Sequence, residues 1–519
     1  MQMNILARFL CLLGASIALL PSASPHHAPP PPSATLDAGV IVGNTATALG
    51  SKVTVNQFLG VPFAAKPVRF GMPEPPTPWK HLLETTNQPP ACPQQFNGQA
   101  IERNILIETF NTPPPPAGES EDCLYLNVYA PATLTKKKPV LFFLYGGSSQ
   151  YGCNSIPRYD GTNFAANQEV IIVAPNYRTN VFGFSNSPQI PFDQLNVGYH
   201  DQRLALQWVQ RNIHAFGGDP AAVTLWGWAS GASCVDNLIT TTPIDPPFRA
   251  AIMQSGQTGI FGHPTNATHA WDSLAQQLNC SAQPDVLECV RAANVTTIIS
   301  ILELSNLLFS PVKDNITDLL YPETALETGN VSHVPVLLGT TAQDGGVYVY
   351  GQDNTTAWLN AVLGSHPILF AEIEEEYAFG TTANGRPITD DSQQISAFYT
   401  DIVYQCVMAI RANESITGGI PTWRYLYNAT FPNLQPYPGA LVYHGSENFL
   451  IFGNLPANTT DSEVKFSKFM QKLWADHAKN PRVGPSWPQN PTIRTVSSID
   501  IDTRCGFLEP YLAAAGGGG

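Results

Sequence analysis

The chain has few charged residues, and most of those it has are acidic. Only 13% of its 519 residues are Asp, Glu, Lys or Arg, whereas 43% are hydrophobic. That balance is typical of a globular protein and excludes a disordered chain or a coiled coil. The formal net charge of −14 at pH 7 disfavours nucleic acid and anionic membranes as partners.

Long apolar runs are also scarce, and the one at the N-terminus is short. Residues 1–23 are predicted to be a secretory signal, because Arg8 precedes the apolar run Phe9 to Leu20 and small residues follow it. A signal anchor is the alternative, but this run is too short for a membrane span. We expect a protein of the secretory pathway, with no membrane span after signal removal.

The rest of the chain shows no internal repeat and no strong linker. Residues 24–35 are expected to be a Pro-rich spacer that does not pack, and residues 511–519 a flexible tail. Residues 36–510 are therefore predicted to form one domain.

Asn-x-Ser/Thr sequons are frequent, and all lie in the second half of the chain. Together with a signal peptide they predict a glycosylated, exported protein. The sequons are at Asn266, Asn279, Asn294, Asn315, Asn330, Asn354, Asn413, Asn428 and Asn458.

Motifs for cofactors and metals are absent: there is no P-loop, dinucleotide fingerprint or zinc-ligand spacing. We expect no cofactor and no metal. What is present is an alternation of apolar strands and amphipathic helices. Strands are predicted at 140–145, 170–174 and 222–226, and helices at 201–215 and 232–239. This order predicts an α/β fold with a large, mostly parallel sheet flanked by helices.

Several segments resemble the type-B carboxylesterase and cholinesterase family. Residues 121–131 (EDCLYLNVYAP) fit that family's signature at every position. Further matching segments are LGVPFA (59–64), NYRTNVFGF (176–184), HDQRLALQWVQRNIHAFGGDP (200–220), AIMQSGQ (251–257) and VYHGSENFLIFG (442–453). The resemblance implies an α/β-hydrolase fold and two disulfides, Cys92–Cys123 and Cys280–Cys289. The pairing of Cys153, Cys234, Cys406 and Cys505 stays open.

The family's nucleophile is the serine of a Gly-x-Ser-x-Gly turn between a strand and a helix. Gly227 and Gly231 mark that turn here, and the nucleophile position holds Ala229. A methyl group cannot attack a carbonyl. Ser230 is the alternative nucleophile, although in relatives its position contributes only a backbone N–H to the oxyanion hole. Trp228 replaces the usual neighbour of the nucleophile and is expected to pack in the core.

The resemblance also assigns the other catalytic positions. His444, in His-Gly-Ser-Glu, corresponds to the general base, and Asp344 stands where relatives have the orienting acid, usually Glu. The oxyanion loop reads Gly-Gly-Ser-Ser instead of Gly-Gly-Gly-Phe, so Gly147 and Ser148 are the expected backbone donors. Serine tolerates fewer backbone angles than glycine, which makes the geometry of this loop an open question. Cys153 and Cys234 are further alternative nucleophiles.

These changes predict a catalytically impaired carboxylesterase-like protein that binds a hydrophobic small molecule or an ester-like ligand. Its lost serine resembles the auxiliary esterase-like proteins of viriditoxin-type polyketide pathways. The segments around Cys406 and Cys505 resemble fungal sequences and indicate a fungal source. The viriditoxin-type resemblance implies a partner oxidase, such as a laccase, whose coupling reaction the protein steers. The alternative is an active carboxylesterase or lactone hydrolase that uses Ser230, or a water activated by His444. An adhesion role is disfavoured because no stalk or membrane span is present.

Overall fold

A computed structural model gives the fold of most of the chain. It describes residues 30–48, 51–98, 100–133, 136–257, 263, 267–364, 367–490, 493–496 and 505. The predicted signal, the first part of the predicted spacer, the tail and Asn266 lie outside the described residues. Within the predicted spacer, Ser33–Thr35 form strand β1, which pairs antiparallel with β2 (Val40–Val42). Unlike the prolines before them, these residues have N–H groups to donate to a partner strand.

The core of the fold is a ten-stranded sheet in the described part of the chain. From β15 to β8, neighbouring strands are parallel, whereas β8, β6, β4 and β3 pair antiparallel. In spatial order the strands are β15 (Ile493–Val496), β14 (Thr422–Tyr427), β11 (Val336–Thr341), β10 (Ala250–Gln254), β9 (Gly218–Trp228), β7 (Lys138–Leu144), β8 (Ile171–Pro175), β6 (Tyr125–Pro131), β4 (Thr54–Pro62) and β3 (Asn44–Thr47).

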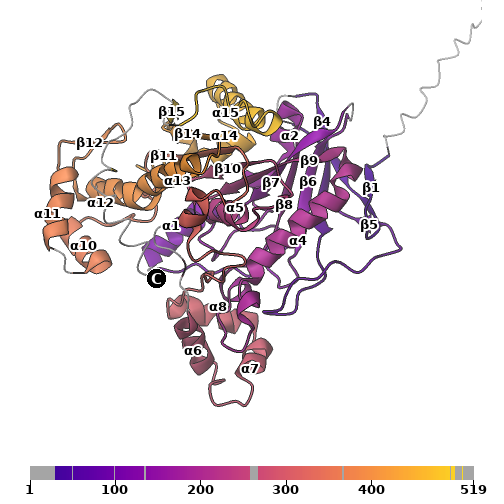
Figure 1. Ribbon diagram of the computed structural model, residues 1–519, viewed down its shortest axis with the longest axis horizontal. Helices are drawn as coiled ribbons and strands as arrows, with labels where there is room; N and C mark the ends of the chain where they lie inside the picture. The colour runs from indigo at the N-terminus through magenta and orange to yellow at the C-terminus, as the bar shows by residue number, and fades with distance from the viewer. Residues whose placement is uncertain are drawn as a thin grey trace, which may run out of the picture. The chain divides into compact units, whose positions relative to one another are not determined.

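The central strands are apolar along nearly their whole length because both faces of the sheet are covered. Every residue of β8, β10 and β11 is buried. Figure 1 shows helices on opposite sides of the sheet. One face carries α2 (Thr162–Gln168), α14 (Asn448–Phe452) and α15 (Asp461–Lys479). The other carries α4 (Val197–Asn212), α5 (Ser230–Thr241), α9 (Pro322–Glu327) and α13 (Cys406–Thr417). The predicted α/β-hydrolase architecture is confirmed.

The remaining elements form smaller layers around this sheet. Helices α6 to α8 pack around one apolar cluster, which also includes Phe70 and Phe182, and α10 to α12 pack around another. These elements are α1 (Ala100–Phe110), α3 (Asn180–Gly183), α6 (Thr268–Gln277), α7 (Val286–Ala292), α8 (Val295–Leu304), α10 (Thr355–Leu363), α11 (Pro367–Glu376), α12 (Asp391–Thr400), the strands β5 (Leu83–Glu84), β12 (Thr382–Ala383) and β13 (Arg386–Pro387), the 3₁₀ turns η1 (Pro157–Tyr159), η2 (Phe192–Gln194), η3 (Ile213–Phe216) and η5 (Pro432–Leu434), and the π-helix η4 (Asp401–Gln405).

Three disulfide bonds join described residues. They are Cys92–Cys123, Cys280–Cys289 and Cys406–Cys505. The first two are the pairs that the family resemblance implies. The third settles a pairing that the spacing of the cysteines left open. Cys153 and Cys234 are free, buried thiols.

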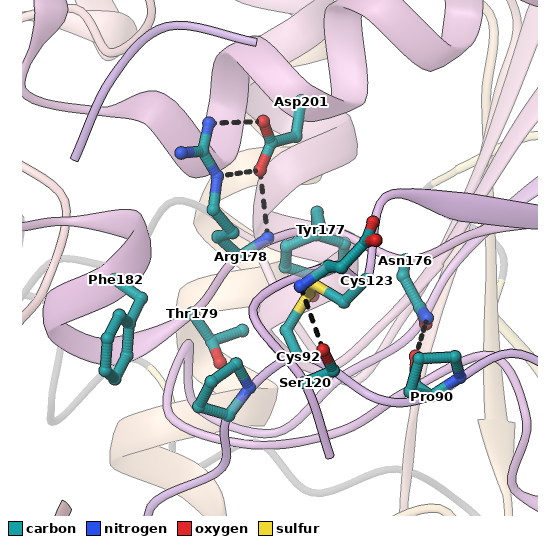
Figure 2. The surroundings of a disulfide bond; sticks show 12 residues. Pro90, Cys92, Ser120, Cys123, Asn176, Tyr177, Arg178, Thr179, Phe182 and Asp201 are labelled. Atoms are coloured by element: carbon teal, nitrogen blue, oxygen red, sulfur yellow. Dashed lines mark hydrogen bonds and ion pairs between the residues drawn. A yellow bond between two sulfur atoms is a disulfide. The ribbon is translucent and has the colours of Figure 1, made fainter. Parts of the chain in front are cut away.

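The first disulfide lies beside the loop that follows β8 (Figure 2). In that loop, the Asn176 side-chain amide donates to the carbonyl of Pro90 at 2.9 Å. The Arg178 guanidinium makes two hydrogen bonds to the Asp201 carboxylate, at 2.9 and 2.7 Å. Arg178 and Asp201 are both buried, so their charges are paired away from water. These contacts hold the loop between β8 and α4, which in turn supports the candidate active site.

The predicted glycosylation sites differ in exposure. Asn428 is 5% exposed and its amide lies against the carbonyl of Asn384, which leaves no room for a glycan. The exposed sequon residues are Asn279, Asn294, Asn315, Asn330, Asn354, Asn413 and Asn458. In the part of the chain that the structure describes, no helix is long and apolar enough to span a membrane.

Candidate active site

Strand β9 ends in a tight turn that leads directly into α5. Its central residue, Ala229, has φ 53° and ψ −127°, a conformation that side-chain-bearing residues rarely adopt. Two glycines make the turn possible. A Cβ on Gly227 would lie 2.2 Å from the Gly231 carbonyl oxygen, and one on Gly231 would lie 2.1 Å from that of Leu144. The Ala229 methyl faces the oxyanion loop, since a Cβ on Gly146 would come within 2.6 Å of it.

His444 and Asp344, one hundred residues apart, meet in the structure. His444 Nδ1 lies 2.8 Å from Asp344 Oδ1, and both side chains are fully buried. The other carboxylate oxygen, Oδ2, accepts from the Thr341 backbone N–H and the Ser255 hydroxyl, each at 2.9 Å. A carboxylate on Nδ1 favours the tautomer with the proton there, so that Nε2 carries a lone pair. Nε2 is buried and finds no hydrogen-bond partner among the described residues.

Aromatic rings surround the histidine. Measured between ring centroids, they are Trp228 at 5.0 Å, Tyr404 at 5.0 Å, Tyr348 at 5.4 Å and Phe110 at 6.1 Å. Tyr404 is carried by the π-helix Asp401–Gln405, a local irregularity that often occurs at functional sites. No sequence motif pointed to Tyr404, Tyr348 or Phe110. A π-helix leaves no periodic signal that could have revealed Tyr404.

Trp228 is part of the buried core, as expected, and its ring lies beside His444. It is 2% exposed. A Cβ on Gly146 would lie 2.8 Å from Trp228 Cε3, and one on Gly445 would lie 2.5 Å from Cζ2. The indole therefore fills the space between the oxyanion loop and the histidine loop. A side chain at position 146 or 445 would clash with it.

The oxyanion loop keeps an unusual backbone despite its serines. Ser148 and Ser149 have φ values of 54° and 58°, in the left-handed region that glycine adopts most easily. The Ser149 N–H donates to Ser230 Oγ at 3.2 Å, and the Ser149 carbonyl accepts from the Asn180 N–H at 2.6 Å. Among the described residues, no acceptor takes the N–H of Gly147 or Ser148. Ser230 opens α5, so its N–H has no acceptor within the helix.

None of the alternative nucleophiles is bonded to the histidine. The Ser230 hydroxyl supports the oxyanion loop instead. The Cys153 thiol contacts Ser155 Oγ, and burial raises its pKa to about 11. The Cys234 thiol accepts from Gln202, and burial raises its pKa to about 12. Both thiols therefore stay protonated at neutral pH, where they are poor nucleophiles.

A buried acid links the two sides of the site. Burial, and next the nearby charge of Asp344, raise the pKa of Glu447 to about 8, so this carboxyl is mostly protonated at pH 7. Its Oε1 accepts from the Gln254 amide at 2.8 Å. The Gln254 carbonyl accepts from the Ala229 N–H, also at 2.8 Å. The turn and the histidine loop are thus joined through Gln254. Gln254 lies in the matching segment 251–257, but no motif assigned it a role.

Comparisons with known proteins identify a family and relatives of this chain. The profile described as Carboxylesterase family matches residues 30–504. The chain is 33% identical over 499 residues to acetylcholinesterase of Bungarus fasciatus, covering 89% of this chain and 81% of that protein. It is 31% identical over 462 residues to para-nitrobenzyl esterase of Bacillus subtilis (84% and 88% covered). It is 29% identical over 512 residues to liver carboxylesterase 1F of Rattus norvegicus (88% of each).

Proposed function

The chain belongs to the carboxylesterase family, and on that basis we propose that it binds an ester-like or hydrophobic small molecule without hydrolysing it. One observation carries the proposal. The strained turn of this fold, which serves to display a nucleophilic hydroxyl, displays the methyl group of Ala229. Removal of the serine from such a triad costs about 10⁶ in kcat, whereas binding survives.

Binding is supported by the groups that remain. The N–H groups of Gly147 and Ser148 have no acceptor among the described residues and lie in the loop beside Ala229, where a ligand carbonyl can accept from them. His444 Nε2 offers a lone pair to a ligand hydroxyl. The surrounding aromatic rings favour an apolar or aromatic ligand.

The structure disfavours Ser230 as a substitute nucleophile, because its Oγ is taken by the Ser149 N–H. Hydrolysis by water is the remaining catalytic route, since His444 Nε2 is free to activate one. Without a covalent intermediate, we expect this route to be slow.

We further propose that the protein acts in the secretory pathway or outside the cell. Three disulfides and seven exposed sequons support an oxidising, glycosylating compartment. The missing serine supports an auxiliary role in fungal polyketide metabolism, in which the bound phenol is presented to a laccase-type oxidase. A change in the ratio of coupled products when the protein is added to laccase and a phenol would support that role, and an unchanged ratio would count against it.

The direct test separates binding from turnover. Purified protein is mixed with p-nitrophenyl esters of increasing chain length. Release of p-nitrophenol is followed by absorbance and bound ester by equilibrium dialysis. We expect saturable binding with release close to the buffer rate. Turnover in the range of ordinary enzymes, about 1–10³ s⁻¹, would contradict the proposal.

A further inference from the structure

A cavity lies beside the loop that carries Asp344. Its volume is about 560 Å³, within the range of small-molecule sites. Its walls come from the loop after β11, the β12–β13 hairpin, α12 and the segment 437–441 before the histidine. Neither Ala229, Ser148 nor His444 lines it.

Two side chains in its wall hold buried donors that have no acceptor in the part of the chain that the structure describes. Arg386 donates through Nη2 to Thr430 Oγ1 at 3.1 Å, but its Nε is buried without an acceptor. Among the described residues, no carboxylate comes within ion-pair distance of Arg386. Gln343 accepts from the Val442 N–H through Oε1 at 3.2 Å, while its Nε2 is buried and unpaired. Unpaired buried donors cost free energy, which a ligand with acceptor oxygens recovers.

The remaining wall is mixed, with polar residues on α12 and the hairpin and an apolar, aromatic part beside them. The rings of Tyr350 and Tyr437 meet edge to face, with centroids 4.6 Å apart. Ile388 is buried beside Pro387 on the hairpin side. Such a surface suits a flat ring that stacks against tyrosine.

We propose that this cavity binds a small aromatic carboxylate. The carboxylate accepts from Arg386, whose planar fork matches its geometry, and from the Gln343 amide. The ring lies against Tyr350 and Tyr437. Asp390 also lines the cavity and is exposed. Its negative charge favours a monoanion over a polyanion.

The position of this site connects it to the candidate active site. Gln343 precedes Asp344 in the chain, and its backbone N–H donates to the Val442 carbonyl at 3.1 Å. Leu441, in the same wall, has φ 53°, a strained value for a branched side chain. A ligand held here contacts the two loops that carry the acid and the histidine.

The test measures binding of radiolabelled benzoate and of benzamide, its neutral analogue, by equilibrium dialysis. Four proteins are compared: the wild type, Arg386→Gln, Ala397→Phe, which fills the cavity from α12, and Arg482→Gln, which removes an exposed arginine elsewhere. We expect Arg386→Gln to weaken benzoate binding at least about tenfold and benzamide binding much less, because hydrogen bonds to charged groups are the stronger ones. Ala397→Phe should abolish binding of both compounds, and Arg482→Gln should change neither.

Melting temperatures establish that each variant is folded. If Ala397→Phe fails to fold, the proposal is still tested by Arg386→Gln, whose affinity for benzoate should fall more than its affinity for benzamide. Absence of saturable benzoate binding to the wild type would overturn the proposal. Equal weakening of benzoate by Arg386→Gln and Arg482→Gln would also overturn it, because the effect would then come from net charge.

Discussion

The two halves of the candidate active site differ in how completely their functional groups are present. The acid–histidine half (Asp344, His444, Thr341, Ser255) has a complete set of hydrogen bonds around the carboxylate. The turn half (Ala229, with the loop 146–149 and Ser230) keeps the strained backbone, but none of its hydroxyls is hydrogen-bonded to His444 Nε2. The orienting machinery is therefore present without the group that it orients.

This difference shows what holds each half in place. The turn is imposed by close packing, because the backbone around Gly227 and Gly231 approaches too closely for any side chain. That packing does not involve the side chain at position 229, so the turn keeps its strained conformation with alanine there. The acid–histidine pair depends instead on buried hydrogen bonds, which cost free energy when one member is removed.

Restoring the hydroxyl should have the largest effect. The wild type already has the backbone angles that the turn needs at position 229, the Asp344–His444 pair, and oxyanion-loop N–H groups with no acceptor among the described residues. We expect hydrolysis of p-nitrophenyl acetate by Ala229→Ser to rise at least about 10³-fold over the wild type, a part of the factor of about 10⁶ that a triad serine supplies. The measurement is initial rates at pH 7.5. The double variant Ala229→Ser/His444→Gln should lose the gain, and an unchanged rate in the single variant would mean that Trp228 and the loop serines have remodelled the site.

Removing the acid should be the most damaging change to stability. Asp344→Asn takes the charge from a carboxylate that receives three hydrogen bonds while fully buried. We expect a loss of about 2–4 kcal/mol in the free energy of unfolding. Urea titration measures it, with Asp353→Asn, at an exposed position, as the control that stays within about 0.5 kcal/mol. A loss as small as that of the control would show that the pair is not a structural element.

Glu447 makes stability depend on pH. The folded protein holds the Glu447 proton up to a pKa of about 8, whereas the unfolded chain releases it near the ordinary value of 4.5. Between these values the folded state binds more protons, so this residue lowers stability as pH rises, with a limiting slope of about 1.4 kcal/mol per pH unit. Glu447→Gln should remove that contribution between about pH 5 and 8. Parallel stability–pH curves for both proteins would contradict this assignment.

A substitution in the turn half should have the smallest effect on stability. Ser230→Ala removes one hydrogen bond, from the Ser149 N–H at 3.2 Å, in a partly exposed place. We expect a loss of about 1 kcal/mol in the free energy of unfolding, because water can replace the hydroxyl. A loss as large as that of Asp344→Asn would show that the two halves are equally dependent on hydrogen bonds.

Much of the fold follows from the sequence, because the central strands are continuous apolar runs and the helices have a clear period. The predicted helix 201–215 corresponds to α4 and the 3₁₀ turn after it, and the predicted strand 222–226 lies within β9. Strand β1 was missed, since three residues next to a proline run carry no pattern.

The site was predictable only where a motif carries it. Asp344 and His444 are brought together as the family order implies. The ring of Tyr404 and the cavity at Arg386 were not predictable, because both depend on how α12, a π-helix and a two-residue hairpin pack, and local sequence does not encode that packing. The pairing of Cys406 with Cys505 is likewise a tertiary fact.

The most direct test of the central claim is labelling with a fluorophosphonate, read by intact mass and peptide mapping. Our account predicts no adduct on the wild-type protein and one adduct at position 229 of Ala229→Ser. An adduct at Ser230 of the wild type, blocked by His444→Gln, would contradict the account, because it would show that the chain still has a working nucleophile.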